Sequence, residues 1–156
     1  MTLYLASTSP RRRELLAQVD IDFQVLDIAI DESKRSNELP TAYVERLAKE
    51  KAEAGFKAVH SDEHAIVLAA DTIVVLEDDI LGKPSSQEQA GQMLRALSGR
   101  SHVVMTAFAI KTAKDIRVQR VNTTVFFRSI TSKDIDWYWR TGEQQDKAGG
   151  YGIQSK

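Results

Sequence analysis

The longest mostly apolar run, residues 65–76, constrains the fold more than any other feature of the chain. Successive positions are apolar, so an extended strand over residues 66–76 would be apolar on both faces, which is typical of a central strand covered on both sides. The run is too short to cross a bilayer, and it contains Asp71. We therefore expect a buried strand at the centre of a sheet and no transmembrane helix.

Other segments predict further elements in mixed order along the chain. Strands are expected over residues 3–6, 23–30, 102–111 and 116–127, the last two as a hairpin, with a turn at residues 77–79. Four helices are expected. The first begins at Pro10 after a Ser9 cap, and the second covers residues 40–56. The third begins at a capping box formed by Ser86 and Gln89 and ends at Gly99, and the fourth begins at a Ser132 cap and ends at Gly142.

Composition narrows the class of protein. A chain of 156 residues has the usual size of one domain, so a single compact unit is expected. Cys is absent, which excludes a disulfide scaffold, a thiolate zinc site and a cysteine nucleophile. The net charge of -1 disfavours binding to nucleic acid by bulk charge. An Arg cluster follows the first apolar run, the reverse of a signal peptide, so we expect a cytoplasmic protein with no membrane partner.

The first candidate site is the segment STSPRRR at residues 7–13, between a predicted strand and a predicted helix. Cations in the first turn of a helix oppose its dipole, at a cost of about 0.3 to 1 kcal/mol per exposed charge. A bound anion would remove this conflict, and free backbone N–H groups, small hydroxyls and guanidinium groups together can bind phosphate. The alternative is that the arginines are only solvated helix formers.

Asp71 is the second candidate, because a carboxylate in an apolar strand is costly unless a cation or strong donors compensate it. It is either half of a structural ion pair or a metal-binding or catalytic group. Thr72 follows it and points to the other face of the strand. Lys51 lies seven residues after Val44, on the apolar stripe of the helix over residues 40–56. It either projects inward across a pocket or extends to solvent.

Three weaker signals accompany these. Lys83 precedes Pro84 and either reaches an anion or belongs to an ordinary loop, and Glu32 sits in an acidic patch whose default interpretation is a solvated loop. His60 and His64 have the spacing of a metal pair on a helix, but the residues between them are typical of a loop. Taken together, the residues indicate a metal-assisted enzyme acting on phosphates.

Six blocks of the sequence resemble, in order, the signature blocks of the Maf family of nucleoside triphosphate pyrophosphatases: LASTSPRRRELL, YVERLAKEKA, AADTIVV, GKP, MLRALSGRSHVVMT and DKAGGYGIQ. The resemblance runs from Leu3 to Gln154. It implies an α/β fold similar to inosine triphosphatase, with a mixed β-sheet, flanking helices and two lobes around a central cleft. Family members continue beyond the last block with a further strand and helix, so this chain is expected to be C-terminally incomplete relative to them.

The resemblance also implies an activity, the release of pyrophosphate and a nucleoside monophosphate with a divalent cation, Mg or Mn. Ser7, Arg11 and Arg12 would hold phosphates, and Lys51 and Lys83 would neutralise charge during phosphoryl transfer. Glu32 and Asp71 would hold the metal or activate water. Arg12, Thr72 and Gln154 resemble the subgroup that acts on dTTP and UTP. Modified pyrimidine nucleotides are expected substrates too, which implies a house-cleaning role in the nucleotide pool.

Two other functions are weighed against this one. The Maf family was first associated with inhibition of cell division, so a nucleotide-binding regulator of septum formation without turnover is the main alternative. The second alternative is nucleic-acid binding through the Arg cluster and the aromatic residues Trp137, Tyr138 and Trp139. The net charge of -1 disfavours it. A homodimer that covers a sheet edge is a further expectation.

Overall fold

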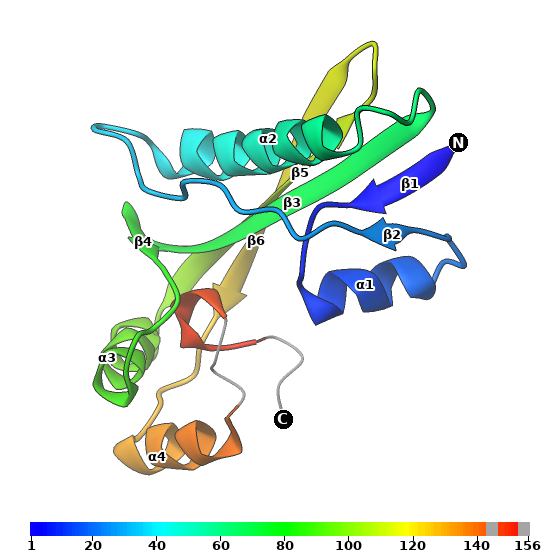
Figure 1. Cartoon of the computed structure of the whole chain (residues 1–156). Helices are drawn as coiled ribbons and strands as arrows, with labels where there is room; N and C mark the ends of the chain where they lie inside the picture. Colours follow the sequence, from blue (N-terminus) through cyan, green and yellow to red (C-terminus); the bar gives the residue numbers. More distant parts are fainter. Residues whose placement is uncertain (143–146, 153–156) are drawn as a thin grey trace. The chain divides into compact units, whose positions relative to one another are not determined.

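The computed structural model describes residues 1–142 and 147–152 (Figure 1). The chain divides into two compact units, which we describe separately: unit 1 is Met1–Asp71 with Thr106–Val121, and unit 2 is Thr72–Met105 with Asn122–Lys156. One mixed sheet in the order β2-β1-β3-β5-β6, with β4 paired to β3, contributes strands to both units. The predicted mixed α/β architecture is confirmed.

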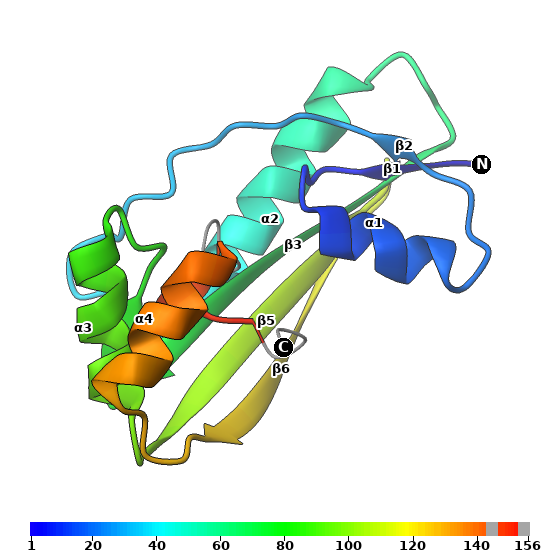
Figure 2. The same cartoon turned by 90° about the horizontal axis from the view of Figure 1, so that it is seen from below.

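Unit 1 is built around parallel strands. β1 (Thr2–Leu5) pairs in parallel with β2 (Gln24–Val25) and with β3 (Ala65–Leu76). Helix α2 (Pro40–Ala58) lies against this sheet beside β3 (Figures 1 and 2). A Cβ atom at Gly55 would lie 2.9 Å from Val67 Cγ1 and 3.0 Å from the Ala6 Cβ, so only glycine allows this approach of helix and strands.

Two predictions in unit 1 are corrected. The strand expected over residues 23–30 is reduced to the two residues of β2, because β1 offers partners only up to Leu5, whose carbonyl accepts from Leu26 N at 2.9 Å. Ser9 is the N-cap residue of α1 (Pro10–Ala17), all of which the structure describes, but the Ser9 side chain does not make the capping hydrogen bond that we expected. Leu15 in α1 and Val19 just after it, whose spacing favours an apolar face of the helix, are exposed.

Unit 2 packs around Val74, Leu76 and Leu97, which are buried together. Glu77 turns the chain with φ 58°, and β4 (Asp79–Leu81) then pairs antiparallel with β3, a strand that the sequence pattern did not predict. The other elements with residues in this unit are α3 (Gln87–Leu97), β5 (Ser101–Lys111), β6 (Ile116–Phe126), α4 (Ser132–Thr141) and the 3-10 turn η1 (Ala148–Gly150).

Helix caps in unit 2 differ in detail from those predicted. Ser86 does cap α3 by accepting from Gln89 N, but the Gln89 side chain accepts from Ser85 N instead of closing a reciprocal box. The cap of α4 is Thr131 and not Ser132, because Thr131 and Asp134 form the reciprocal box one position earlier. Within residues 1–142 and 147–152, no helix has both the length and the apolar character needed to cross a membrane.

Candidate active site

The candidate site of unit 1 lies where β1 ends. Ala6 N donates to the carbonyl of Leu68 at 2.9 Å, so β1 ends beside the fourth residue of β3, three residues before Asp71, while β3 itself continues to Leu76. Because β1 and β3 run in the same direction, Ser7 follows β1 toward the same edge as Asp71. Binding sites of open α/β sheets form at such carboxyl ends.

Lys51 joins two carboxylates at this edge. Its Nζ lies 2.7 Å from Asp71 Oδ1 and 2.7 Å from Glu32 Oε1. The Lys51 and Asp71 side chains are 12% and 14% exposed, whereas Glu32 is 55% exposed. Burial lowers the pKa of Lys51, but the Asp71 and Glu32 carboxylates outweigh burial, and the pKa is raised overall. Lys51 is therefore a cation that projects inward, one of the two orientations left open by its position on the apolar stripe.

Ser7 and Arg12 belong to the same cluster. The Ser7 hydroxyl accepts hydrogen bonds from Arg12 Nη1 at 3.1 Å and from Ser9 N at 3.2 Å. Burial lowers the pKa of the Arg12 guanidinium, the Asp71 carboxylate acts in the opposite direction, and Arg11 lowers it further. Arg12 thus lies within the electrostatic field of Asp71. Arg11, its neighbour, is exposed.

The remaining predicted site residues lie outside this cluster. Thr72 follows Asp71 in β3 and is half-buried, and Lys83 is exposed just after β4; both belong to unit 2. Gln154 lies outside the described residues. His60 and His64 are exposed, and the described part of the chain holds no group of three or more His, Asp or Glu side chains placed to bind a metal.

A shared divalent cation can be tested against the donors that are present. Glu32 Oε1 and Asp71 Oδ1 both lie 2.7 Å from one ammonium nitrogen, so they are separated by at most twice that distance. Mg²⁺ in nucleotide enzymes is commonly held by one or two carboxylates, with water and substrate phosphates completing the shell. Two converging carboxylates beside basic side chains fit this pattern of ligands.

Sequence reasoning missed two side chains at this site. Tyr43 Oη donates to the carbonyl of Glu32 at 2.7 Å, and Arg46 Nη2 donates to the carbonyl of Ser33 at 3.0 Å. Tyr43 and Arg46 are three residues apart on α2, a spacing that places them on neighbouring turns of one face. That spacing was visible in the sequence, but their contact with the segment after β2 was not.

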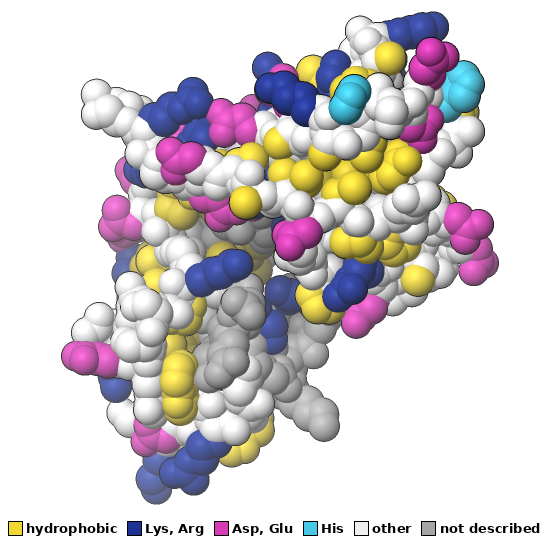
Figure 3. All heavy atoms as spheres, viewed as in Figure 1, with side chains coloured by type: hydrophobic (Ala, Val, Ile, Leu, Met, Phe, Trp, Pro, Cys, Tyr) yellow, Lys and Arg dark blue, Asp and Glu magenta, His cyan; other side chains and the backbone are white. Residues whose placement is uncertain are grey.

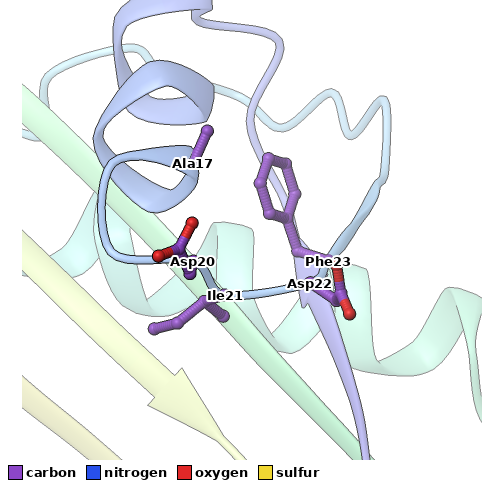
Figure 4. Close-up of a pocket in the computed structure, with 5 residues that line it drawn as sticks. All are labelled: Ala17, Asp20, Ile21, Asp22 and Phe23. Atoms are coloured by element: carbon purple, nitrogen blue, oxygen red, sulfur yellow. The ribbon is translucent and has the colours of Figure 1, made fainter.

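A surface hollow also occurs in unit 1, lined by Ala17, Asp20, Ile21, Asp22 and Phe23 (Figure 4). These residues connect α1 to β2, and none belongs to the cluster around Lys51. The hollow therefore lacks the paired charges that make the Lys51 cluster a candidate for chemistry.

The chain is similar to proteins of one family over nearly its whole length. Residues 2–156 match the family described as Maf-like protein. Relatives named dTTP/UTP pyrophosphatase come from Pectobacterium atrosepticum, 52% identical over 99% of this chain and 77% of that protein, from Shewanella oneidensis, 50% identical over 99% and 82%, and from Aliivibrio fischeri, 48% identical over 97% and 81%.

Among solved structures, the Staphylococcus aureus Ham1 protein is similar with a TM-score of 0.57 and 16% sequence identity, covering 81% of this chain and 71% of that one. That likeness concerns the fold. The family match covers nearly every residue, and the relatives share about half of their aligned residues with this chain, so the chain belongs to the Maf family.

Proposed function

We propose that this chain hydrolyses nucleoside triphosphates to a nucleoside monophosphate and pyrophosphate, with dTTP, UTP and modified pyrimidine nucleotides as substrates. The observation that supports this best is the cluster in which Lys51 contacts Asp71 and Glu32 while Arg12 lies in the field of Asp71. Relatives that are 48–52% identical are named dTTP/UTP pyrophosphatases. Lys51, Arg12, Asp71 and Glu32 all belong to unit 1, which supports the proposal that they act together on phosphate.

Triphosphate binding is assigned to the residues that follow β1. The Ser7 hydroxyl orients Arg12, and Arg11 on the same first turn of α1 is exposed and open to an anion. Guanidinium groups and helix N-terminal N–H groups recognise phosphate oxygens. A bound triphosphate would also relieve the opposition between the arginines and the α1 dipole.

Hydrolysis breaks the anhydride bond between the α- and β-phosphates, adds the oxygen of water to phosphorus and releases a proton. The Asp71 carboxylate would accept that proton or hold a cation together with Glu32. Mg²⁺ or Mn²⁺ bound by these two carboxylates would polarise water and neutralise phosphate charge. Lys51, and Lys83 from unit 2, would stabilise the negative charge that spreads over the oxygens during transfer.

Base selection is assigned to Thr72 and Gln154. Their side chains offer donors and acceptors to the edge of a small base, and a site built on such groups rejects a partner that leaves them unpaired. A preference for dTTP and UTP over ATP and GTP is expected. The cytoplasmic location and the homodimer stay predictions.

Pyrophosphate release from dTTP, UTP, CTP, ATP and GTP, each with Mg²⁺, with Mn²⁺ and with chelator, tests this function. We expect metal-dependent turnover of dTTP and UTP and little turnover of purine nucleotides. Nucleotide binding without turnover would instead support the septum regulator. Because the net charge is -1, we expect no salt-sensitive binding of oligonucleotides in the same panel, and the face shown in Figure 3 carries acidic and basic side chains together.

A further inference from the structure

Glu32 lies in an irregular segment, where neither a helix nor a strand holds its backbone. Residues 26–39 between β2 and α2 form neither helix nor strand. Glu32 is also the most exposed member of the Lys51 cluster, with 55% of its side chain accessible. Neither a strand ladder nor burial fixes this carboxylate, so apart from its ion pair with Lys51 its position depends on contacts made by the backbone of its segment.

Helix α2 supplies those contacts through two side chains. The carbonyl of Glu32 accepts from Tyr43 Oη at 2.7 Å, and the next carbonyl, that of Ser33, accepts from Arg46 Nη2 at 3.0 Å. The Arg46 guanidinium lies 5.4 Å from the centre of the Tyr43 ring. Two consecutive peptide groups are therefore held by two side chains that also contact each other.

Arg46 is itself fixed at the far end of the segment. Its Nε and Nη2 donate to the two carboxylate oxygens of Glu38 at 2.6 and 2.8 Å, and Nη1 donates to Glu50 Oε2 at 3.0 Å. The Arg46 and Glu38 side chains are only 11% and 8% exposed. The hydrogen bonds from Arg46 lower the pKa of Glu38 to about 2, so the pair stays ionised at neutral pH.

Glu38 also binds the backbone of the segment, since its Oε2 accepts from Arg35 N at 3.0 Å. One guanidinium thus connects the start of the segment, through Ser33, with its end, through Glu38. A planar group with several fixed donors is needed for this arrangement, and a lysine ammonium does not reproduce it.

We propose that Tyr43 and Arg46 are positioning residues that hold Glu32 in place for the reaction, an inference that rests on the proposed function. Lys51 and Tyr43 lie two turns apart on α2, so one helix orients both the ammonium and the carboxylate that it contacts. Outer residues that orient a ligand carboxylate typically change metal affinity or activity by about 10- to 100-fold when they are altered.

The test uses Arg46→Lys and Tyr43→Phe, with Lys49→Ala as the matched control. Lys49 is a basic residue of the same helix, and its contact with Glu53, at 3.9 Å, lies away from the segment. Tyr43→Phe keeps the ring and removes only the hydroxyl, so folding is expected to survive. For each variant we would measure hydrogen exchange of residues 31–38 without metal or nucleotide, and the dependence of dTTP turnover on Mg²⁺ concentration.

We expect faster exchange in residues 31–38 for Arg46→Lys and Tyr43→Phe and unchanged exchange in β1 and β3. Arg46→Lys should lower kcat/KM and raise the Mg²⁺ requirement by about 10- to 100-fold, and Tyr43→Phe should act in the same direction by about 2- to 10-fold. Lys49→Ala should match the original chain in both measurements. If Arg46 acts through the Glu32 carboxylate, its effect should disappear when that carboxylate is absent. In a Glu32→Gln variant that keeps residual turnover, adding Arg46→Lys should therefore lower kcat/KM by no more than about twofold, which is within the usual scatter of additivity.

Unchanged exchange in both variants would overturn the inference, and so would faster exchange with normal turnover and normal Mg²⁺ dependence. An equal loss from Arg46→Lys with and without the Glu32 carboxylate would also overturn it, because Arg46 would then act on something else. Absence of pyrophosphate release by the unaltered chain would instead contradict the proposed function, whatever the exchange of residues 31–38.

Discussion

The backbone N–H of Gly149 donates a hydrogen bond to the carbonyl oxygen of Gly82 at 2.9 Å. Gly149 has φ 69°, and a Cβ atom there would lie 3.1 to 3.2 Å from three side-chain atoms of Val74. The 3-10 turn η1 therefore packs against β3 in unit 2 and is hydrogen-bonded to Gly82, the residue before Lys83. This position requires a left-handed backbone and a close approach to Val74, and glycine meets both requirements.

Gly149→Ala is expected to lower the free energy of unfolding by about 1 to 3 kcal/mol, because it adds left-handed strain and crowds Val74. Urea denaturation followed by far-UV circular dichroism measures the change. Gly82→Ala is the matched control, since Gly82 is not left-handed and a Cβ there meets no atom within 4 Å. Equal stabilities of the two variants would show that η1 does not depend on this contact.

Asp71→Asn is expected to abolish useful turnover while nucleotide binding survives. We expect kcat for pyrophosphate release to fall by about 10² to 10⁴. The change removes the charge that Lys51 contacts but keeps the volume and hydrogen-bonding capacity of the side chain. Steady-state kinetics and calorimetric titration with dTTP separate the two effects. Asp136→Asn, on the exposed face of α4, is the control. Turnover like that of the original chain would contradict the assignment of Asp71.

The strand over residues 66–76 and the need of Asp71 for a compensating group were predictable because each follows from a local rule. An apolar run predicts a buried strand, and a carboxylate within it requires a compensating group. Lys51 could project inward or extend to solvent, so its contact with Asp71 at 2.7 Å did not follow from the sequence pattern. The catalytic and metal-binding roles of these residues stay predictions.

Features that depend on the path of irregular chain were not predictable. Residues 23–30 have the composition of a strand, yet β2 stops where β1 ends, and the length of a neighbouring strand is not visible in a local pattern. The contacts of Tyr43 and Arg46 depend on how residues 31–38 return to α2. Their periodicity places them on one face of the helix but does not identify what covers that face.

The Lys51 ammonium should change its proton affinity when a carboxylate is removed. In the original chain burial lowers the pKa of Lys51, but Asp71 and Glu32 raise it above its usual value. In Asp71→Asn the effect of burial remains while one opposing charge is lost, so the pKa falls. Competitive labelling of Lys51 with an amine reagent across alkaline pH, read by mass spectrometry, should show its reaction beginning at lower pH in the variant. Identical labelling profiles would mean that the contact at 2.7 Å does not persist in solution.

His102 should make the stability of unit 2 depend on pH. The side chain is buried, its Nε2 is hydrogen-bonded to Tyr151 Oη, and its ring packs edge-on against Phe127 at 5.0 Å between centroids. Within the described part of the chain its Nδ1 has no hydrogen-bond partner. Burial lowers the pKa of His102 below its usual value of 6.5, so the folded state favours the neutral ring.

As the pH falls through 6.5, the unfolded chain binds a proton at His102 before the folded chain does, so this group removes stability at acidic pH and not at alkaline pH. His102→Gln, which can still form a hydrogen bond with Tyr151 but does not titrate, should lose less stability between pH 8 and pH 5 than the original chain. Urea denaturation at both pH values measures the difference. His60→Gln, at an exposed position, should keep the original pH dependence. The same loss of stability in His102→Gln as in the original chain would show that His102 takes up its proton without opposing the fold.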